Sequence, residues 1–192
     1  MMMNKVLLVG NTELLSGLSA TLQAINYSLV ADLNSLRNIT AELFTSGATT
    51  LVASMRELSN DDLNQLLSIQ EESPVTTVLH LETADSQTTR KLAAAGIGAL
   101  VVGALEVARL PQLLDLAEAR LTQLQEMRAQ IADLQQTLQD RKAIDRAKGL
   151  IMGKGKYSEE QAYHALRKLA MSQNQTMGQV AAGVISSAEL FA

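Results

Sequence analysis

Residues 141–152 read RKAIDRAKGLIM and residues 158–171 read SEEQAYHALRKLAM, and these two stretches decide how the chain is organised. Basic residues gather here although the whole chain is acidic, with a formal net charge of −4. Residues 141–192 contain 8 Lys and Arg against 4 Asp and Glu, whereas residues 1–140 contain 8 against 16. This asymmetry indicates a basic module that meets a polyanion, attached to an acidic part with another task.

The basic tail is predicted to form three helical pieces. The first runs through Met152 and breaks within residues 153–156, which are Gly-Lys-Gly-Lys. Ser158 and Gln161 form a Ser-x-x-Gln capping box that starts the second helix. A third helix begins near Thr176. The expected core positions are Met152, Ala162, Ala165, Leu166, Leu169, Ala170, Met171, Met177, Val180, Ala181, Val184 and Ile185.

A long helix is predicted before this tail, because no Gly or Pro occurs between Pro111 and Gly149. Its apolar residues recur in steps of four and three, which average 3.5 and are typical of a left-handed coiled coil. A second copy of the chain is the expected partner, and a helix folded back on its own domain is the alternative. The expected seam residues are Ala117, Leu121, Leu124, Met127, Ile131, Leu134 and Leu138, of which Leu121, Leu124, Ile131, Leu134 and Leu138 are the candidate dimerisation residues.

The first 105 residues alternate between short apolar runs and helix-like stretches. This alternation predicts an α/β fold with a five-stranded parallel sheet and helices on both faces. The expected domains are therefore an α/β domain at 1–108, a coiled-coil helix at 109–140 and a helical module at 141–192. Strands are predicted at 5–10, 27–31, 49–54, 75–81 and 99–102, and helices at 13–25, 36–44, 61–70 and 86–95.

The composition excludes several classes of protein. Cysteine is absent, so disulfides and thiolate metal sites are excluded, and His80 and His164 are expected to be structural. No apolar run is long enough for a signal peptide or a membrane span, so a cytoplasmic protein is expected. The chain has no phosphate loop, nucleophile elbow or metal-ligand spacing, and we expect neither enzymatic activity nor a cofactor.

The tail resembles the ANTAR domain, the RNA-binding module of transcription antiterminators of the AmiR and NasT type, which regulate amidase and nitrate assimilation. Residue types and spacings agree across all three helices, over about residues 140–190. The resemblance implies a coiled-coil homodimer that binds paired hairpins in leader mRNA and prevents termination. It also implies control by a ligand-sensing partner protein of the NasS or AmiC kind. The matching runs are Ala147–Met152, Ser158–Tyr163, Leu166–Arg167, Ala170–Met171 and Val180–Ala181.

The α/β part resembles the flavodoxin-like receiver domain of response regulators, but it lacks the residues of phosphorylation. A working receiver needs acidic Mg²⁺ ligands after its first strand, an Asp after the third and a Lys after the fifth. Here these places hold Gly10-Asn11-Thr12 with Glu13 nearby, Ser54-Met55 and Gly103-Ala104. The resemblance therefore implies a pseudo-receiver without a phosphoacceptor, in which Asp32, Asp61 and Asp62 are surface charges.

The candidate RNA-binding residues lie in the tail. Basic side chains would contact phosphates, Tyr163 would stack on a base, and the polar residues of the turn near 174 would read base edges. The ordinary alternatives are solvated helix charges, a tyrosine that caps the core and an N-cap at Asn174 or Thr176. A receiver-type regulator with a DNA-binding helix-turn-helix is the runner-up, and a protein-interaction scaffold is the third interpretation. The candidates are Arg146, Lys148, Lys154, Tyr163, Arg167, Lys168, Ser172, Gln173, Asn174 and Thr176.

Overall fold

A computed structural model describes residues 4–10, 12–154 and 157–190, without the side chains of 12–16, 154 and 190. The chain divides into two compact units. We call Met1–Glu126 the α/β unit and Met127–Ala192 the helical unit. The long helix α5 (Leu110–Lys154) contributes to both.

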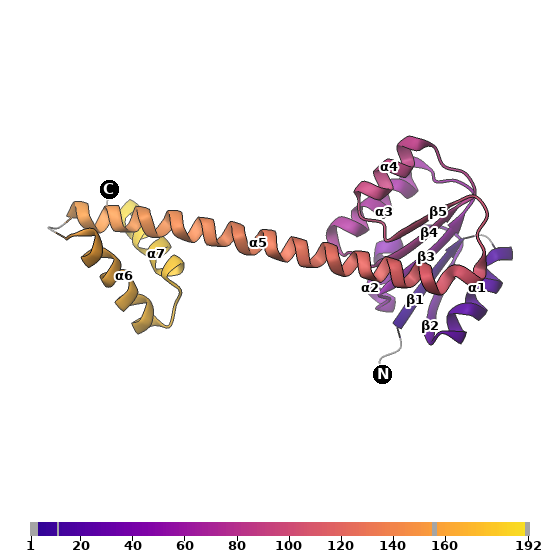
Figure 1. The fold of residues 1–192 in the computed structure, drawn as a ribbon, viewed down its shortest axis with the longest axis horizontal. Helices are drawn as coiled ribbons and strands as arrows, with labels where there is room; N and C mark the ends of the chain where they lie inside the picture. The colour runs from indigo at the N-terminus through magenta and orange to yellow at the C-terminus, as the bar shows by residue number, and fades with distance from the viewer. Residues whose placement is uncertain (1–3, 11, 155–156, 191–192) are drawn as a thin grey trace. The chain divides into compact units, whose positions relative to one another are not determined.

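The α/β unit is built on one five-stranded parallel sheet with the strand order β2-β1-β3-β4-β5 (Figure 1). This order confirms the predicted fold class, because each strand is followed by a helix that crosses back over the sheet. The strands are β1 (Asn4–Gly10), β2 (Tyr27–Leu33), β3 (Thr50–Met55), β4 (Thr76–Leu81) and β5 (Ala99–Val102).

Helices cover both faces of the sheet, as Figure 1 shows. One face packs against α2 (Ile39–Ser46), α3 (Asn60–Glu72) and α4 (Ser86–Ala94). The other packs against α1 (Thr12–Ala24) and the first turns of α5, which follow the 3₁₀ turn η1 (Val107–Arg109). The central strands β3 and β4 are buried along nearly their whole length, which explains why they read as continuous apolar runs.

The beginning of α5 packs on its own sheet. Leu110, Leu114 and Ala117 are fully buried or nearly so in the core beside α1. A Cβ built on Gly98 would lie 2.6 Å from the Cβ of Ala117, so the backbone of the sheet needs a glycine at this approach. The assignment of Ala117 to an intermolecular seam was therefore wrong: the helix that folds back on its own domain accounts for this residue.

The helical unit contains the remainder of α5 together with α6 (Glu159–Gln173) and α7 (Met177–Leu190). Ser158 caps α6 through the predicted capping box, in which its hydroxyl accepts from the Gln161 amide and Gln161 accepts from the Ser158 amide. The core is small and centres on Ala147, Leu166, Ala170, Val180 and Ala181.

Four predicted core positions of the helical unit were wrong. Ala165 is exposed, and Met152, Leu169 and Met171 are 40%, 39% and 75% exposed. The buried stripe of α6 is narrow, with a residue every four positions, because α5 and α7 cover only one side of it. Met177, Val184 and Ile185 are partly buried, at the edge of this core.

Candidate nucleic-acid interface

The outer face of α6 carries a cluster of basic side chains. His164, Arg167, Lys168, Met171 and Ser172 border one shallow surface pocket, because residues three and four apart share a helix face. Among the described residues, neither Arg167 nor Lys168 has a carboxylate partner, and the pocket is lined by none. We call these five residues the α6 outer face. Two cations with solvated heads and an exposed methionine are well suited to contact a polyanion.

The basic residues of α5 have different surroundings. Lys148 forms ion pairs with Asp145 at 2.8 Å and with Glu159 of α6 at 2.7 Å, and its side chain is only 15% exposed. Hydrogen bonds to Asp145 and Glu159 raise the pKa of Lys148 above 10.5, and the hydrogen bond from Lys148 lowers the pKa of Asp145 below 3.8. Arg146 pairs with Glu189 of α7 at 2.7 Å. These two cations tie the three helices together.

Two further candidates for RNA contact are Lys154 and Tyr163. Lys154 ends α5, and its side chain lies outside the described residues. Tyr163 is 41% exposed and borders a pocket that also contains Asp140, Asp145 and Lys148. Its ring contacts that of His164 edge to face, with centroids 6.2 Å apart. Arg141 and Lys148 line the same pocket, so Tyr163 has two acidic and two basic neighbours, whereas the described residues that line the pocket on the opposite side of α6 contain no carboxylate.

The turn between α6 and α7 is organised by its own polar residues. Asn174 ends α6 in the left-handed conformation with φ 52°, which excludes the predicted alternative of an N-cap at this residue. Thr176 caps α7, since its hydroxyl accepts from the Gln179 amide and the Gln179 side chain accepts from the Thr176 amide. The Ser172 hydroxyl donates to the carbonyl of Leu169. Of the four predicted base-reading residues, Gln173 alone lines the large groove of this unit.

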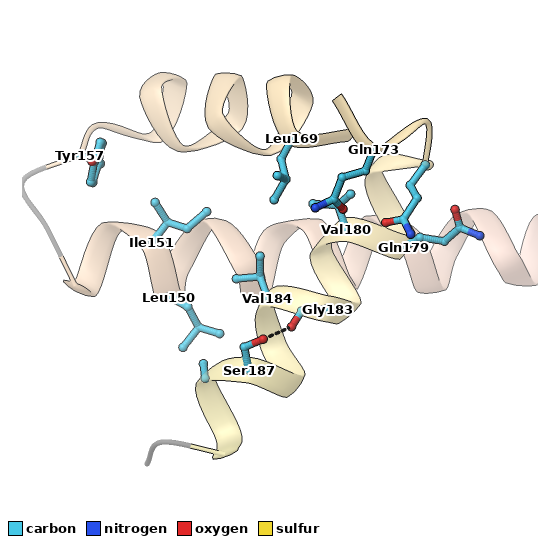
Figure 2. A pocket seen from close by; sticks show the side chains of 12 residues that line it. Leu150, Ile151, Tyr157, Leu169, Gln173, Gln179, Val180, Gly183, Val184 and Ser187 are labelled. Carbon is cyan, nitrogen blue, oxygen red and sulfur yellow. Dashed lines mark hydrogen bonds between the residues drawn. The ribbon is translucent and has the colours of Figure 1, made fainter. Parts of the chain in front are cut away.

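This groove lies between α5, α6 and α7 and has a volume of about 570 Å³ (Figure 2). Leu150 and Ile151 of α5 and Val180 and Val184 of α7 provide apolar walls. Gln173, Gln175 and Gln179 bring amides to it. Gln175 and Gln179 have no sequence signal that marks them as site residues, because only the packing of three helices brings them together with Gln173.

In the α/β unit, hydrogen-bonded residues occupy the strand ends at which a working receiver carries its phosphorylation residues. Ser54 at the end of β3 lies 2.9 Å from Nδ1 of His80, and Nε2 of His80 lies 2.7 Å from the carbonyl oxygen of Gly103. Because a carbonyl only accepts, Nε2 carries the hydrogen and donates, and Nδ1 of the neutral ring accepts from the Ser54 hydroxyl. Ser54 and His80 are each 3% exposed.

Gly10 ends β1, which lies beside β3 on the side opposite to β4. It pairs with Ser54 in register, and a Cβ built on it would lie 1.9 Å from the backbone oxygen of Ser54. The Glu13 side chain lies outside the described residues, while Asp32 and Asp61 are exposed and Asp62 completes the capping box of α3. A chain of hydrogen bonds therefore joins the ends of β3, β4 and β5 where phosphorylation would need a carboxylate and a lysine.

The five candidate dimerisation residues fall into two groups. Leu121 and Leu124 are partly buried on the α/β unit, where Leu121 borders a pocket with Thr49 and Leu124 approaches Gly96. Ile131, Leu134 and Leu138 are 55%, 68% and 53% exposed. The unpartnered part of the heptad pattern thus begins near Met127, which is 48% exposed.

Comparisons with known proteins give matches to a family model, to curated relatives and to solved structures. Residues 132–185 match the family model of the ANTAR domain. A nitrate regulatory protein of Klebsiella oxytoca is 40% identical over 75 residues, which are 39% of this chain and 19% of that relative. The transcriptional regulatory protein PdtaR of Mycobacterium tuberculosis is 30% identical over 93 residues, 48% of this chain and 45% of that relative. The chain thus spans less than half the length of these curated relatives.

Solved structures share the fold of the chain. A signal receiver domain of a diguanylate cyclase from Desulfovibrio desulfuricans G20 covers 63% of this chain and 98% of its own, with a TM-score of 0.54 and 10% identity. The response regulator RcsB of Salmonella typhimurium covers 98% of this chain and 92% of its own, with a TM-score of 0.51 and 14% identity. At these identities the likeness concerns the fold alone.

The chain thus joins an α/β unit with the fold of receiver domains to a small helical unit. Residues 132–185 match the ANTAR domain, as the sequence resemblance predicted. No helix in the described part of the chain is long and apolar enough to cross a membrane. In the same residues, no group of His, Asp and Glu has the arrangement of a metal site.

Proposed function

We propose that this protein is an RNA-binding transcription antiterminator. The helical unit binds paired hairpins in leader mRNA and thereby favours the RNA fold that excludes the terminator. Such a shift requires only that the protein bind one RNA fold more tightly than the other. The relation to a nitrate regulatory protein favours a nitrate-assimilation operon as the target.

The observation that carries this proposal is the contrast between the cations of the helical unit. Arg146 and Lys148 are held by carboxylates of neighbouring helices, whereas Arg167 and Lys168 of the α6 outer face have none among the described residues. A phosphate that meets Arg167 and Lys168 displaces water and counterions but breaks no ion pair. The α6 outer face is therefore the proposed phosphate-binding surface, with Arg167 and Lys168 as its donors.

Dimerisation is the second part of the proposal. Met127, Ile131, Leu134 and Leu138 present a stripe of half-exposed apolar side chains with the 3.5-residue period of a coiled coil. A second copy of the same helix buries this stripe and supplies a second RNA-binding unit, which matches a paired-hairpin target. Two linked sites bind two linked hairpins more tightly than either site alone.

Regulation by a protein partner is the third part. Ser54, His80 and Gly103 occupy the positions of phosphorylation chemistry and satisfy one another, which favours an input other than phosphate. A ligand-sensing protein that binds the α/β unit and releases it when the inducer arrives fits this requirement. The proposed place of action is the cytoplasm, where leader transcripts are made.

A titration with two nucleic acids tests the proposal. The full chain is added to an RNA of two stem-loops and, separately, to duplex DNA of equal charge. We expect the RNA to bind at least tenfold more tightly, and the double variant Arg167→Ala/Lys168→Ala to lose about tenfold in RNA affinity. Arg141→Ala/Lys142→Ala removes the same charge from α5 and is the matched control. Equal affinity for the two nucleic acids, or preference for DNA, would overturn the proposal in favour of a DNA-binding output.

A further inference from the structure

The groove between α5, α6 and α7 has the composition of a ligand site. None of the described residues that line it is charged, and its walls are aliphatic side chains from all three helices. A concave apolar surface of this size with a few convergent polar groups is typical of a site for a flat organic group. Tyr157 borders one end of the groove and Gln173 the other (Figure 2). The whole length of α6 lies between these two residues, so one small ligand does not reach both.

The end with the amides is the better-defined part. Gln173 follows Leu169 by one turn of α6, and Gln179 precedes Val180 on α7. Figure 2 shows these four side chains at the same end of the groove. The Gln179 side-chain oxygen already accepts from the Thr176 amide at 3.0 Å, which leaves its nitrogen as the donating group. The amides can donate and accept hydrogen bonds at the edge of a nucleobase, and the aliphatic side chains can pack against its face.

The position of the groove on α6 supports the same ligand. Lys168 and Ser172 of the α6 outer face each precede a groove residue, Leu169 and Gln173, by one position in the chain. One residue along a helix is a rotation of about 100°, so the cationic surface and the groove adjoin. A strand whose phosphates contact Lys168 can therefore turn a base toward Gln173. On the opposite flank of α6, Tyr163 borders Asp140 and Asp145 of α5 together with Arg141 and Lys148, so this flank has no excess of cations.

We propose that the amide end of this groove binds one unstacked nucleobase from the loop of an RNA hairpin. The base packs on Leu169 and Val180, and Gln173 with Gln175 and Gln179 reads its edge. This inference rests on the proposed RNA-binding function. It adds a site that distinguishes a hairpin loop from a duplex, because a base that is paired in a stem cannot enter the groove.

Glycines supply a matched pair of variants. Gly183 lines the groove one turn after Val180, and a Cβ built on it meets nothing within 4 Å, so we expect the side chain of Gly183→Leu to extend into the groove. Gly149 of α5 is exposed, is not a lining residue, and also meets nothing within 4 Å, so Gly149→Leu is the control. Both changes raise helix propensity, so neither is expected to unfold the unit. Gln173→Leu removes one amide, and Gln139→Leu is its control on an exposed position of α5.

The test measures binding of the full chain to a synthetic RNA of two stem-loops, by fluorescence anisotropy, with 2-aminopurine or an abasic site at one loop position at a time. We expect one loop position at which the abasic site weakens binding at least tenfold and at which 2-aminopurine fluorescence changes on binding. Gly183→Leu and Gln173→Leu should weaken binding to the intact RNA by a similar factor and be insensitive to that abasic site. The two control variants should remain within twofold of the wild type.

The possible failures are distinct. If the wild type binds the RNA but tolerates an abasic site at every loop position, the nucleobase site is wrong and the RNA-binding function stands. If Gly183→Leu keeps its RNA affinity and loses self-association in sedimentation, a second copy occupies the groove and the nucleobase site is again wrong. If the wild type binds neither the RNA nor any loop variant, the proposed function fails as well.

Discussion

The α/β unit and the helical unit treat their polar groups in opposite ways. In the α/β unit, Ser54 and His80 are buried and bonded to each other and to Gly103. In the helical unit, Arg167, Lys168 and Met171 lie on an exposed helix face. The difference shows which polar groups are available to another molecule: Ser54 and His80 are satisfied within the α/β unit, whereas Arg167 and Lys168 are exposed on α6.

The first prediction tests how tightly the closed edge of the α/β unit is packed. Gly10→Ala places a methyl group against the backbone oxygen of Ser54 and should cost roughly 3 kcal/mol or more of unfolding free energy. Gly103→Ala meets no atom within 4 Å but keeps a positive φ of 96°, so it should cost roughly 1–2 kcal/mol. Urea titration followed by the β3 amide signals measures both. Equal losses of unfolding free energy in the two variants would contradict the close packing of Gly10 against Ser54.

The second prediction separates the two parts of α5. Ile131→Asp/Leu134→Asp places charges in the exposed stripe and should weaken self-association by at least about 100-fold, because a coiled coil buries these positions. Ala132→Asp/Gln139→Asp adds the same charge to exposed positions outside the stripe and should leave association unchanged. Sedimentation velocity over a concentration series distinguishes the two. If the wild-type chain stays monomeric at every concentration, a second copy does not bury this stripe and the proposed dimer is wrong.

The third and smallest prediction concerns the ion pairs that hold the helical unit. The pKa of Asp145 is lowered below 3.8, so its stabilising contribution is present above that pH and is lost as the pH falls through the lowered value. The pKa of Lys148 is raised above 10.5, so its contribution is lost only above that pH. Thermal melts between pH 2 and 6 should show a shallower acid decline for Asp145→Asn than for the wild type. Identical pH profiles would mean that the pair is not formed in solution.

The sequence predicted the fold well, because the relevant signals are local. Alternating apolar runs and helical stretches predicted the parallel sheet, and Ser158 marked the start of α6 through a capping box that the structure contains. The missing carboxylates and lysine of the receiver were equally visible, since each belongs to the end of a known strand.

The candidate site was less predictable, because it depends on contacts between distant segments. Lys148 was expected to contact phosphate, yet its partner Glu159 lies beyond the break after α5, and no spacing rule indicates that pair. Asp145, one turn before Lys148 on α5, is the second partner of this lysine. Met171 was assigned to the core because methionine is apolar, and it lies on the surface because no third element covers that side of α6.

The salt dependence of RNA affinity tests the central claim most directly. The logarithm of the association constant is measured against the logarithm of salt concentration for the wild type, Arg167→Ala/Lys168→Ala and Arg141→Ala/Lys142→Ala. Two lost phosphate contacts should reduce the slope for the α6 variant by roughly 1.4 to 1.8, and the α5 control should keep the wild-type slope. If all three slopes coincide, or if only the control changes, Arg167 and Lys168 are not the phosphate contacts and the account fails.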